Sequence, residues 1–151
     1  RVRPIIRFLE PGGYFGFDKE PLEAAWATIK REQLDSRYPR LWRTVDFDLT
    51  PLGDRQVQMA LAHSVFSHVP IAVIRHCLDK LRPILIGPLL ASVWLGSQHI
   101  LGSRHLTRTN EYGHVEYPID LLRFLAKESG FRLESVESYG HPGGQQMIVF
   151  R

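Results

Sequence analysis

The sequence predicts an α/β fold in which a mostly parallel sheet is covered by helices on both faces. Segments with apolar residues at helical spacing alternate along the chain with short apolar runs of strand length, and this alternation is typical of parallel sheets. The final two strand-length segments are joined by a Gly- and Pro-rich loop at residues 140–144, which predicts an antiparallel hairpin. A length of 151 residues suits one domain with a sizeable core, so we expect residues 1–151 to form a single domain.

Helices are predicted where apolar residues recur every three or four positions. Four segments meet this description, at residues 1–10, 21–34, 70–82 and 118–129. In the second segment Trp26 and Ile29 lie on one apolar stripe, and in the third Ile74 and Leu78 do the same. Gly130 follows the last segment, as expected of a residue just beyond a helix end.

Strands are predicted at residues 14–17, 41–49, 57–62, 89–95, 131–139 and 145–150. The runs at 57–62 and 89–95 are nearly continuous apolar stretches, which favours strands buried on both faces. The polar stretch 96–113 is long enough to form a lid or a binding loop.

Charge and cysteine content narrow the possible partners. The formal net charge of the chain is only +3, and the basic residues are dispersed along the sequence. We therefore expect no nucleic-acid partner. The single cysteine, Cys77, rules out an intrachain disulfide and fits a reducing compartment, so we expect a cytoplasmic protein. No apolar run approaches the ~18 residues that would span a membrane, and we expect no membrane partner.

The stretch Gln56–Pro70, with the sequence QVQMALAHSVFSHVP, joins a predicted buried strand to a polar and aromatic cluster. In open α/β sheets, ligands bind beyond the carboxyl ends of the strands. The imidazoles of His63 and His68 therefore mark a candidate site, although solvated polar groups at a strand end would give the same pattern.

Four segments of the chain resemble the class I S-adenosylmethionine-dependent methyltransferases. They are YFGFD at residues 14–18, AHSVFSHVP at 62–70, SVW at 92–94 and the ending GFRLESVESYGHPGGQQMIVFR at 130–151. The resemblance implies a Rossmann-like, doubly wound and mostly parallel sheet with an antiparallel C-terminal hairpin. It also implies S-adenosylmethionine as the cofactor and methyl transfer to an oxygen or nitrogen of a small-molecule acceptor.

The resemblance also assigns cofactor contacts to particular residues. Asp18 would accept hydrogen bonds from the ribose hydroxyls, because a carboxylate can take both at once, and Lys19 would flank the adenine pocket. Asp46 and Phe47, which we expect at the end of the strand at 41–49, would meet the adenine, with Asp48 as the competing candidate if the strand register differs by a residue or two. The methionine part of the cofactor would lie beside His63 and Ser64.

The acceptor side is assigned in the same way. Phe66 and His68 would line the approach of the acceptor, and His63 or His68 would serve as a general base, since imidazole titrates near neutrality. Either histidine could instead bond to the backbone and only shape the pocket. His141 and Gln145 would help to line the acceptor pocket, or else belong to a hairpin loop with no binding role. The histidines lack the tight spacing of metal ligands, so we expect no metal.

The chain departs from the family pattern at its amino end. The family's first strand and glycine-rich loop have no counterpart before Tyr14, and residues 1–10 resemble the helix that follows that loop. That strand lies at the centre of the family's sheet, so we expect an N-terminally truncated version of the fold. The alternative to an enzyme is a non-catalytic, methyltransferase-like binding module or fragment without a complete cofactor site.

Overall fold

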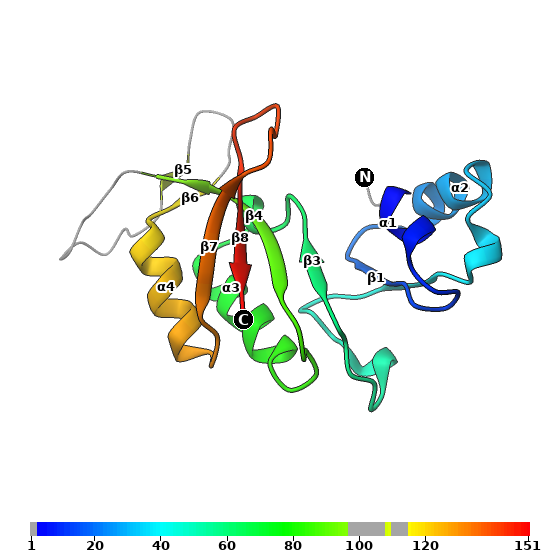
Figure 1. Cartoon of the computed structure of the whole chain (residues 1–151), viewed down its shortest axis with the longest axis horizontal. Helices are drawn as coiled ribbons and strands as arrows, with labels where there is room; N and C mark the ends of the chain where they lie inside the picture. The colour runs from blue at the N-terminus through cyan, green and yellow to red at the C-terminus, as the bar shows by residue number, and fades with distance from the viewer. Residues whose placement is uncertain (1–2, 97–107, 110–114) are drawn as a thin grey trace. The chain divides into compact units, whose positions relative to one another are not determined.

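The computed structural model of the protein describes residues 3–96, 108–109 and 115–151. The chain forms two compact units, Arg1–Pro51 and Leu52–Arg151 (Figure 1). Their strands belong to two different sheets. A single domain over residues 1–151 stays a prediction.

The first unit is built around two parallel strands. Its order is α1 (Arg3–Phe8), β1 (Phe15–Asp18), α2 (Glu23–Arg31) and β2 (Arg40–Arg43), with a short 3-10 turn at Asp35–Arg37. Another 3-10 turn, Thr50–Leu52, includes the first residue of the second unit. The strands pair in register, so that Asp18 at the end of β1 lies opposite Arg43 at the end of β2. Both carboxyl ends therefore reach the same edge of this small sheet.

The two faces of the β1–β2 sheet have different roles. One face packs on a core in which Ile6, Ile29 and Leu34 are buried and Tyr14 and Leu41 are partly buried. Successive side chains of a strand point to opposite faces, so the other face carries aromatic residues. Phe17 and Trp42 stack there with ring centroids 5.2 Å apart. The helices thus cover the aliphatic face, and the aromatic face is half-buried.

The second unit is a larger, mixed sheet with two helices. Its elements are β3 (Ala60–Ala62), a 3-10 turn (Phe66–His68), α3 (Ile71–Leu81), β4 (Leu89–Leu95), β5 (Arg108–Thr109), β6 (Val115–Tyr117), α4 (Ile119–Glu128), β7 (Leu133–Ser138) and β8 (Gln146–Phe150). The strand order is β5-β6-β4-β8-β7, with β3 also paired to β4. Strands β3 and β6 run parallel to β4, whereas β8 runs antiparallel to it.

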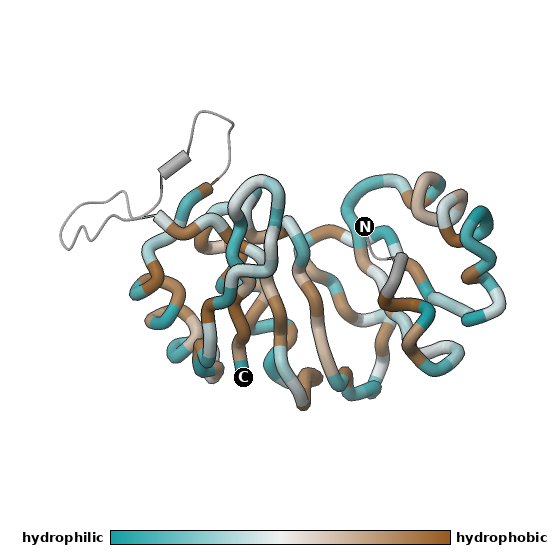
Figure 2. The backbone as a smooth tube through the Cα atoms, turned by 45° about the horizontal axis from the view of Figure 1, so that its top comes forward, coloured by the Kyte–Doolittle hydropathy of each residue, from teal (hydrophilic) through white to brown (hydrophobic). Residues whose placement is uncertain are grey.

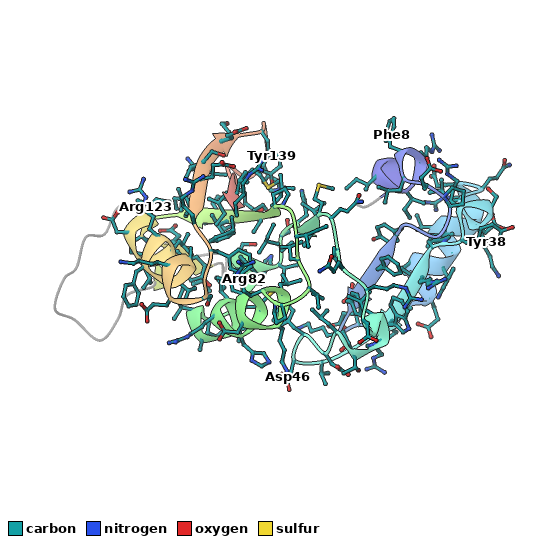
Figure 3. The ribbon with its side chains drawn as sticks, turned by 60° about the horizontal axis from the view of Figure 1, so that its bottom comes forward. Phe8, Tyr38, Asp46, Arg82, Arg123 and Tyr139 are labelled. Atoms are coloured by element: carbon teal, nitrogen blue, oxygen red, sulfur yellow. The ribbon has the colours of Figure 1, made fainter. Side chains whose placement is uncertain are left out.

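The core of the second unit lies between the sheet and the helices α3 and α4 (Figure 1). Leu89, Ala91 and Val93 alternate along β4 and are almost completely buried, and Ile148 of β8 lies beside Ala91. Hydrophobic residues, brown in Figure 2, run along these strands, while hydrophilic residues gather in the loops. Arg82, just after α3, lies over the Phe131 ring at 5.2 Å from its centroid (Figure 3).

Most predicted elements are confirmed, although the ends of several differ. All four helices form, the strand at 89–95 is reproduced residue for residue, and the final hairpin is antiparallel. The strand predicted at 57–62 shortens to Ala60–Ala62, with an isolated parallel bridge between Val57 and Leu85. The chain also forms β6, which the sequence did not predict, and β6 pairs with β5 inside the predicted 96–113 loop. The rest of that loop, residues 97–107 and 110–113, lies outside the described residues.

The strand predicted at 41–49 is wrong in its second half. It ends at Arg43 because Asp46 and Phe47 adopt left-handed backbone conformations, with φ of 53° and 51°, and left-handed residues cannot continue a strand. None of the described helices is both long and apolar enough to cross a membrane.

Gly87 lies where the approach to β4 passes close to the approach to β3. A Cβ atom there would lie 1.9 Å from the backbone oxygen of Gln58, and backbone cannot move aside as a flexible side chain can. We expect Gly87→Ala to reduce the free energy of unfolding by about 2–3 kcal/mol, measured by urea denaturation. The control Ile86→Ala removes a neighbouring side chain that is 62% exposed and should change the value by less than about 0.5 kcal/mol. Equal stability of the two variants would contradict this account.

Cys77 makes stability depend on alkaline pH. The thiol is buried on α3, and burial raises its pKa from 9.0 to about 12. The unfolded chain loses the thiol proton above pH 9.0 while the folded chain keeps it, so the free energy of unfolding falls as pH rises from 9.0 toward 12. Between about pH 8 and about pH 10 we expect a loss of about 1 kcal/mol that Cys77→Ala removes. The pKa values of Tyr14 and Tyr117 are raised too. Because their ordinary pKa is 10.0, above that of the thiol, most of their effect on the free energy of unfolding comes at higher pH. An identical decline in wild type and Cys77→Ala would rule the thiol out.

Candidate functional site

The residues predicted to form the site fall into both units. Asp18, Lys19, Asp46 and Phe47 belong to the first unit, and all the predicted histidines belong to the second. Each group is therefore described within its own unit.

Asp18 is an exposed carboxylate at the carboxyl end of β1. Its Oδ1 accepts a hydrogen bond from the backbone N–H of Glu20 at 3.0 Å, which holds the side chain against the turn that follows the strand. A second, backbone link joins the strand ends, because the Thr44 N–H donates to the carbonyl oxygen of Asp18 at 2.8 Å. The carboxylate is thus fixed in position, and its exposed side can accept further hydrogen bonds. Two neighbouring hydroxyl groups could donate those hydrogen bonds.

Charged and polar groups around Asp18 come from both strands. The Arg43 Nε donates to the backbone oxygen of Lys19 at 3.1 Å, and the Lys19 ammonium lies 3.8 Å from the Glu20 carboxylate with most of its side chain exposed. Tyr14 lies close enough to feel the Asp18 charge. Burial, and after it the Asp18 carboxylate, raises the pKa of the Tyr14 phenol.

Asp46 and Phe47 lie in a tight turn after β2 instead of at a strand end. Both are non-glycine residues in the left-handed region, where each costs about 1–2 kcal/mol. The Thr44 hydroxyl donates to the backbone oxygen of Asp48 at 3.1 Å, and the Thr50 N–H donates to the side-chain Oδ1 of Asp48 at 3.0 Å. These bonds hold the turn in its strained shape. Phe47 is half-buried and Asp46 is exposed (Figure 3), so their predicted adenine contact stays a prediction.

In the second unit the polar cluster begins at a sharp turn directly after β3. Ser64 is left-handed, with φ of 56°. Its backbone N–H donates to the buried hydroxyl of Ser92, on the neighbouring strand β4, at 2.6 Å. A buried backbone donor without a partner would cost about 1–3 kcal/mol, so the Ser92 hydroxyl stabilises the turn that directs His63 and Ser64 to the end of the sheet.

Gln145 connects this turn to the start of β8. The side chain is only 4% exposed. Its Oε1 accepts from the Ser64 hydroxyl at 3.3 Å, and its Nε2 donates to the fully buried hydroxyl of Ser67 at 3.2 Å. The Ser64 hydroxyl also lies 3.3 Å from Nδ1 of His63. A continuous hydrogen-bonded chain therefore runs from the interior to an exposed imidazole.

Three aromatic rings gather at the same end of the sheet. Tyr139 directly follows β7 (Figure 3) and His141 lies in the hairpin loop. The His63 ring centroid is 6.0 Å from that of Tyr139 and 5.9 Å from that of His141, and the last two are 5.6 Å apart. The structure thus brings the predicted His63 and His141 together, although 78 positions separate them in the sequence.

Phe66 and His68 lie on the 3-10 turn that precedes α3. The Phe66 side chain is fully buried and His68 is exposed. Tyr117, also fully buried, donates its hydroxyl to the backbone oxygens of Phe66 and Val69 and so ties this turn to β6. In this structure Phe66 packs in the core, and its predicted contact with an acceptor stays a prediction.

Two of these neighbours were not predicted from the sequence as site residues. Ser92 is the single hydroxyl residue within the otherwise apolar LLASVWL strand, and that exception is the signal that could have identified it. Tyr139 carries no comparable signal, because its proximity to His63 depends on how the hairpin pairs. Among the described residues, no group of three or more His, Cys, Asp or Glu side chains has an arrangement that could hold a metal ion.

Comparisons with known proteins bear on the fold. No protein-family model and no curated protein sequence matches this chain. Solved structures do match. Mitomycin 7-O-methyltransferase MmcR superimposes with a TM-score of 0.68 at 14% identity, over 93% of this chain and 49% of its own. The Burkholderia thailandensis 1,6-didemethyltoxoflavin-N1-methyltransferase, solved with S-adenosylhomocysteine, gives 0.61 at 16% identity, over 99% of this chain and 76% of its own.

These likenesses establish the fold. The magnesium protoporphyrin IX methyltransferase ChlM from Synechocystis PCC 6803, solved with bound SAM, agrees with a TM-score of 0.62 at 12% identity, over 90% of this chain and 57% of its own. The predicted Rossmann-like, mostly parallel fold of the S-adenosylmethionine-dependent methyltransferases is confirmed. The chain spans about half the length of several of these structures, for example 42% of a Burkholderia thailandensis O-methyltransferase family protein.

Gly143 positions the hairpin loop that carries His141. A Cβ atom at Gly143 would lie 3.1 Å from the Trp94 ring and 3.4 Å from Cε1 of His141, and the Gly143 N–H donates to His141 Nδ1 at 3.1 Å. We expect Gly143→Ala to push the loop off the indole and to shift the indole N–H resonance of Trp94 in a 1H–15N spectrum. Gly140→Ala is the matched control, because a Cβ there meets no atom within 4 Å; it should strain the loop but leave the Trp94 resonance in place. A Trp94 resonance unmoved by Gly143→Ala would contradict the packing described here.

Proposed function

We propose that the protein takes part in methyl transfer from S-adenosylmethionine to an oxygen or nitrogen of a small-molecule acceptor. The main support is the combination of the methyltransferase fold with an exposed, positioned carboxylate, Asp18, at the carboxyl end of β1. The names of the similar structures point to small acceptors, among them mitomycin and didemethyltoxoflavin. The protein would act in the cytoplasm, without a nucleic-acid or membrane partner.

The first unit would hold the nucleoside part of the cofactor. Asp18 would accept hydrogen bonds from the ribose hydroxyls, since its carboxylate is exposed and already oriented by the Glu20 N–H. Lys19 would flank the adenine. The strained Asp46–Phe47 turn would provide further adenine contacts, and its cost is of the kind seen at ligand-binding turns.

The second unit would serve the methionine part and the acceptor. His63 and Ser64 would lie beside the methionine part, because the Ser64 turn directs them beyond the end of β3. His68, Phe66 and His141 would border the acceptor. Of these, His68 is exposed and His141 is half-buried, so their imidazoles can reach a ligand.

S-Adenosylmethionine would supply an electrophilic methyl group, whose bonding electrons stay on sulfur when the acceptor takes the carbon. The protein's task is then mainly alignment, because in-line displacement depends strongly on orientation. A general base contributes when the acceptor must lose a proton, typically by 10²–10⁴-fold. His63 or His68 would fill that role.

Titration calorimetry with S-adenosylhomocysteine tests the cofactor side directly. We expect the protein to bind it with a Kd on the order of micromolar, and Asp18→Ala to abolish the binding heat because the ribose hydroxyls lose their acceptor. Asp35→Ala is the control, since it removes another exposed carboxylate from the same unit, at a 3-10 turn before β2 and not at the carboxyl ends of the strands.

The proposal fails if the intact protein gives no binding heat, or if Asp18→Ala and Asp35→Ala bind equally well. The first result would favour a non-catalytic module that keeps the fold without the cofactor site. Circular dichroism of each variant establishes that a lost signal reflects the missing carboxylate and not unfolding.

A further inference from the structure

We propose that the buried Gln145 amide, acting through the Ser64 hydroxyl, holds His63 in the tautomer with its proton on Nδ1 and its lone pair on Nε2. The opposite tautomer is set at His141 by the Gly143 backbone. The assignment of tautomers stands on hydrogen bonds alone, and only its catalytic consequence rests on the function proposed above.

The protons available along one hydrogen-bonded chain determine the tautomer of His63. The Ser64 hydroxyl has a single proton, and it is donated to Oε1 of Gln145 at 3.3 Å. Nδ1 of His63 lies 3.3 Å from the same hydroxyl oxygen. Because the hydroxyl proton is already used, the oxygen can only accept at this contact, so Nδ1 of His63 must be the donor. A neutral imidazole that is protonated on Nδ1 carries its lone pair on Nε2.

The orientation of the buried Gln145 amide sets the direction of this chain. Gln145 is 4% exposed and Ser67 is fully buried, so water has little access to either amide end. The Gln145 Nε2 donates to the Ser67 hydroxyl at 3.2 Å, which leaves Oε1 to face Ser64. Ser64 is itself held by its backbone bond to the buried Ser92 hydroxyl. The relay, meaning the hydrogen-bonded chain Ser67–Gln145–Ser64–His63, is therefore held in place at Ser67 and at Ser64 before it reaches the exposed His63 ring.

His141 is set the other way. Its Nδ1 accepts from the Gly143 N–H at 3.1 Å, and a backbone amide can only donate. Nδ1 must then carry the lone pair, and the neutral ring carries its proton on Nε2. Two imidazoles whose centroids are 5.9 Å apart thus offer different groups: His63 presents a proton acceptor on Nε2 and His141 a proton donor.

The two histidines would therefore have different roles toward the methyl acceptor. Nε2 of His63 would take the proton from an acceptor O–H or N–H, and the bonding pair would stay on the acceptor atom for its new bond to carbon. Nε2–H of His141 would donate to a lone pair elsewhere on the acceptor. This favours acceptors that combine an ionisable hydroxyl or amine with a hydrogen-bond-accepting atom. Gln145 acts only through Ser64 and is a positioning residue.

Tautomers can be measured without cofactor or acceptor. A long-range 1H–15N correlation spectrum of the protein with 15N-labelled histidine, at about pH 8, above the ordinary imidazole pKa of about 6.5, distinguishes the two neutral forms. We expect His63 as the Nδ1–H form and His141 as the Nε2–H form. His63 found as the Nε2–H form would overturn the proposal.

Variants test the relay itself. Gln145→Leu removes the acceptor of the Ser64 proton, so the hydroxyl can donate to His63 Nδ1 and the Nδ1–H form should fall from the major to the minor population. Ser64→Ala removes the acceptor of the His63 proton and should have the same effect, which keeps the test valid if Gln145→Leu fails to fold. Ser138→Ala is the matched control, because it removes an exposed hydroxyl at the end of β7 that lies outside this hydrogen-bonded chain, and it should leave the His63 tautomer unchanged. An unchanged tautomer in both Gln145→Leu and Ser64→Ala would overturn the role of Gln145.

Failure of this inference is distinguishable from failure of the proposed function. If S-adenosylhomocysteine does not bind but the tautomers are as assigned, the relay stands and the methyltransferase proposal falls. If binding depends on Asp18 but His63 is the Nε2–H form, the methyltransferase proposal stands and the tautomer assignment falls. In a protein that transfers methyl groups, Gln145→Leu should lower kcat roughly 100-fold, within the usual contribution of a general base.

Discussion

Strand β4 is the constraint on which the second unit depends. It pairs with β3 and β6 in parallel and with β8 in antiparallel fashion, so its backbone groups are satisfied by three neighbours. One face of the strand, with Leu89, Ala91 and Val93, is buried in the core, while Ser92 and Trp94 alternate onto the other face. A substitution that shifted this strand by one residue would exchange the two faces and remove both the core and the site.

The candidate site is a direct product of that alternation. Ser92 brings a buried hydroxyl to the left-handed Ser64 turn, and Trp94 provides the surface on which the Gly143 loop packs. His63 and His141 meet because one follows a neighbour of β4 and the other precedes β8. The same hydrogen bonds satisfy the buried polar groups and position the exposed imidazoles. The polar network therefore specifies one arrangement of the site as well as stabilising the fold.

Backbone strain is present at the predicted ligand-contacting turns of both units, as well as at Gln33 and Tyr38. Ser64, Asp46 and Phe47 all adopt left-handed conformations without being glycine, and each is supported by hydrogen bonds from neighbouring side chains or strands. Strain of this kind persists only when surrounding structure compensates for it. The Ser92 and Thr44 hydroxyls supply that compensation, which connects the cost of these turns to their proposed roles in binding.

The order and type of most elements could be predicted from the sequence, because apolar periodicity and Pro or Gly boundaries act locally. The family resemblance identified Asp18 as a candidate, and His63 and His141 were candidates from their places at a predicted strand end and in a predicted loop. The sequence could not limit β2 to Arg40–Arg43, since the left-handed pair Asp46–Phe47 has no local signature. It also missed β6, whose two partners are distant strands. The hydrogen-bonded chain of Gln145, Ser64 and His63 could not be predicted from the sequence, because these contacts arise from the pairing of β4 with β3 and β8 and from no property of the residues taken alone.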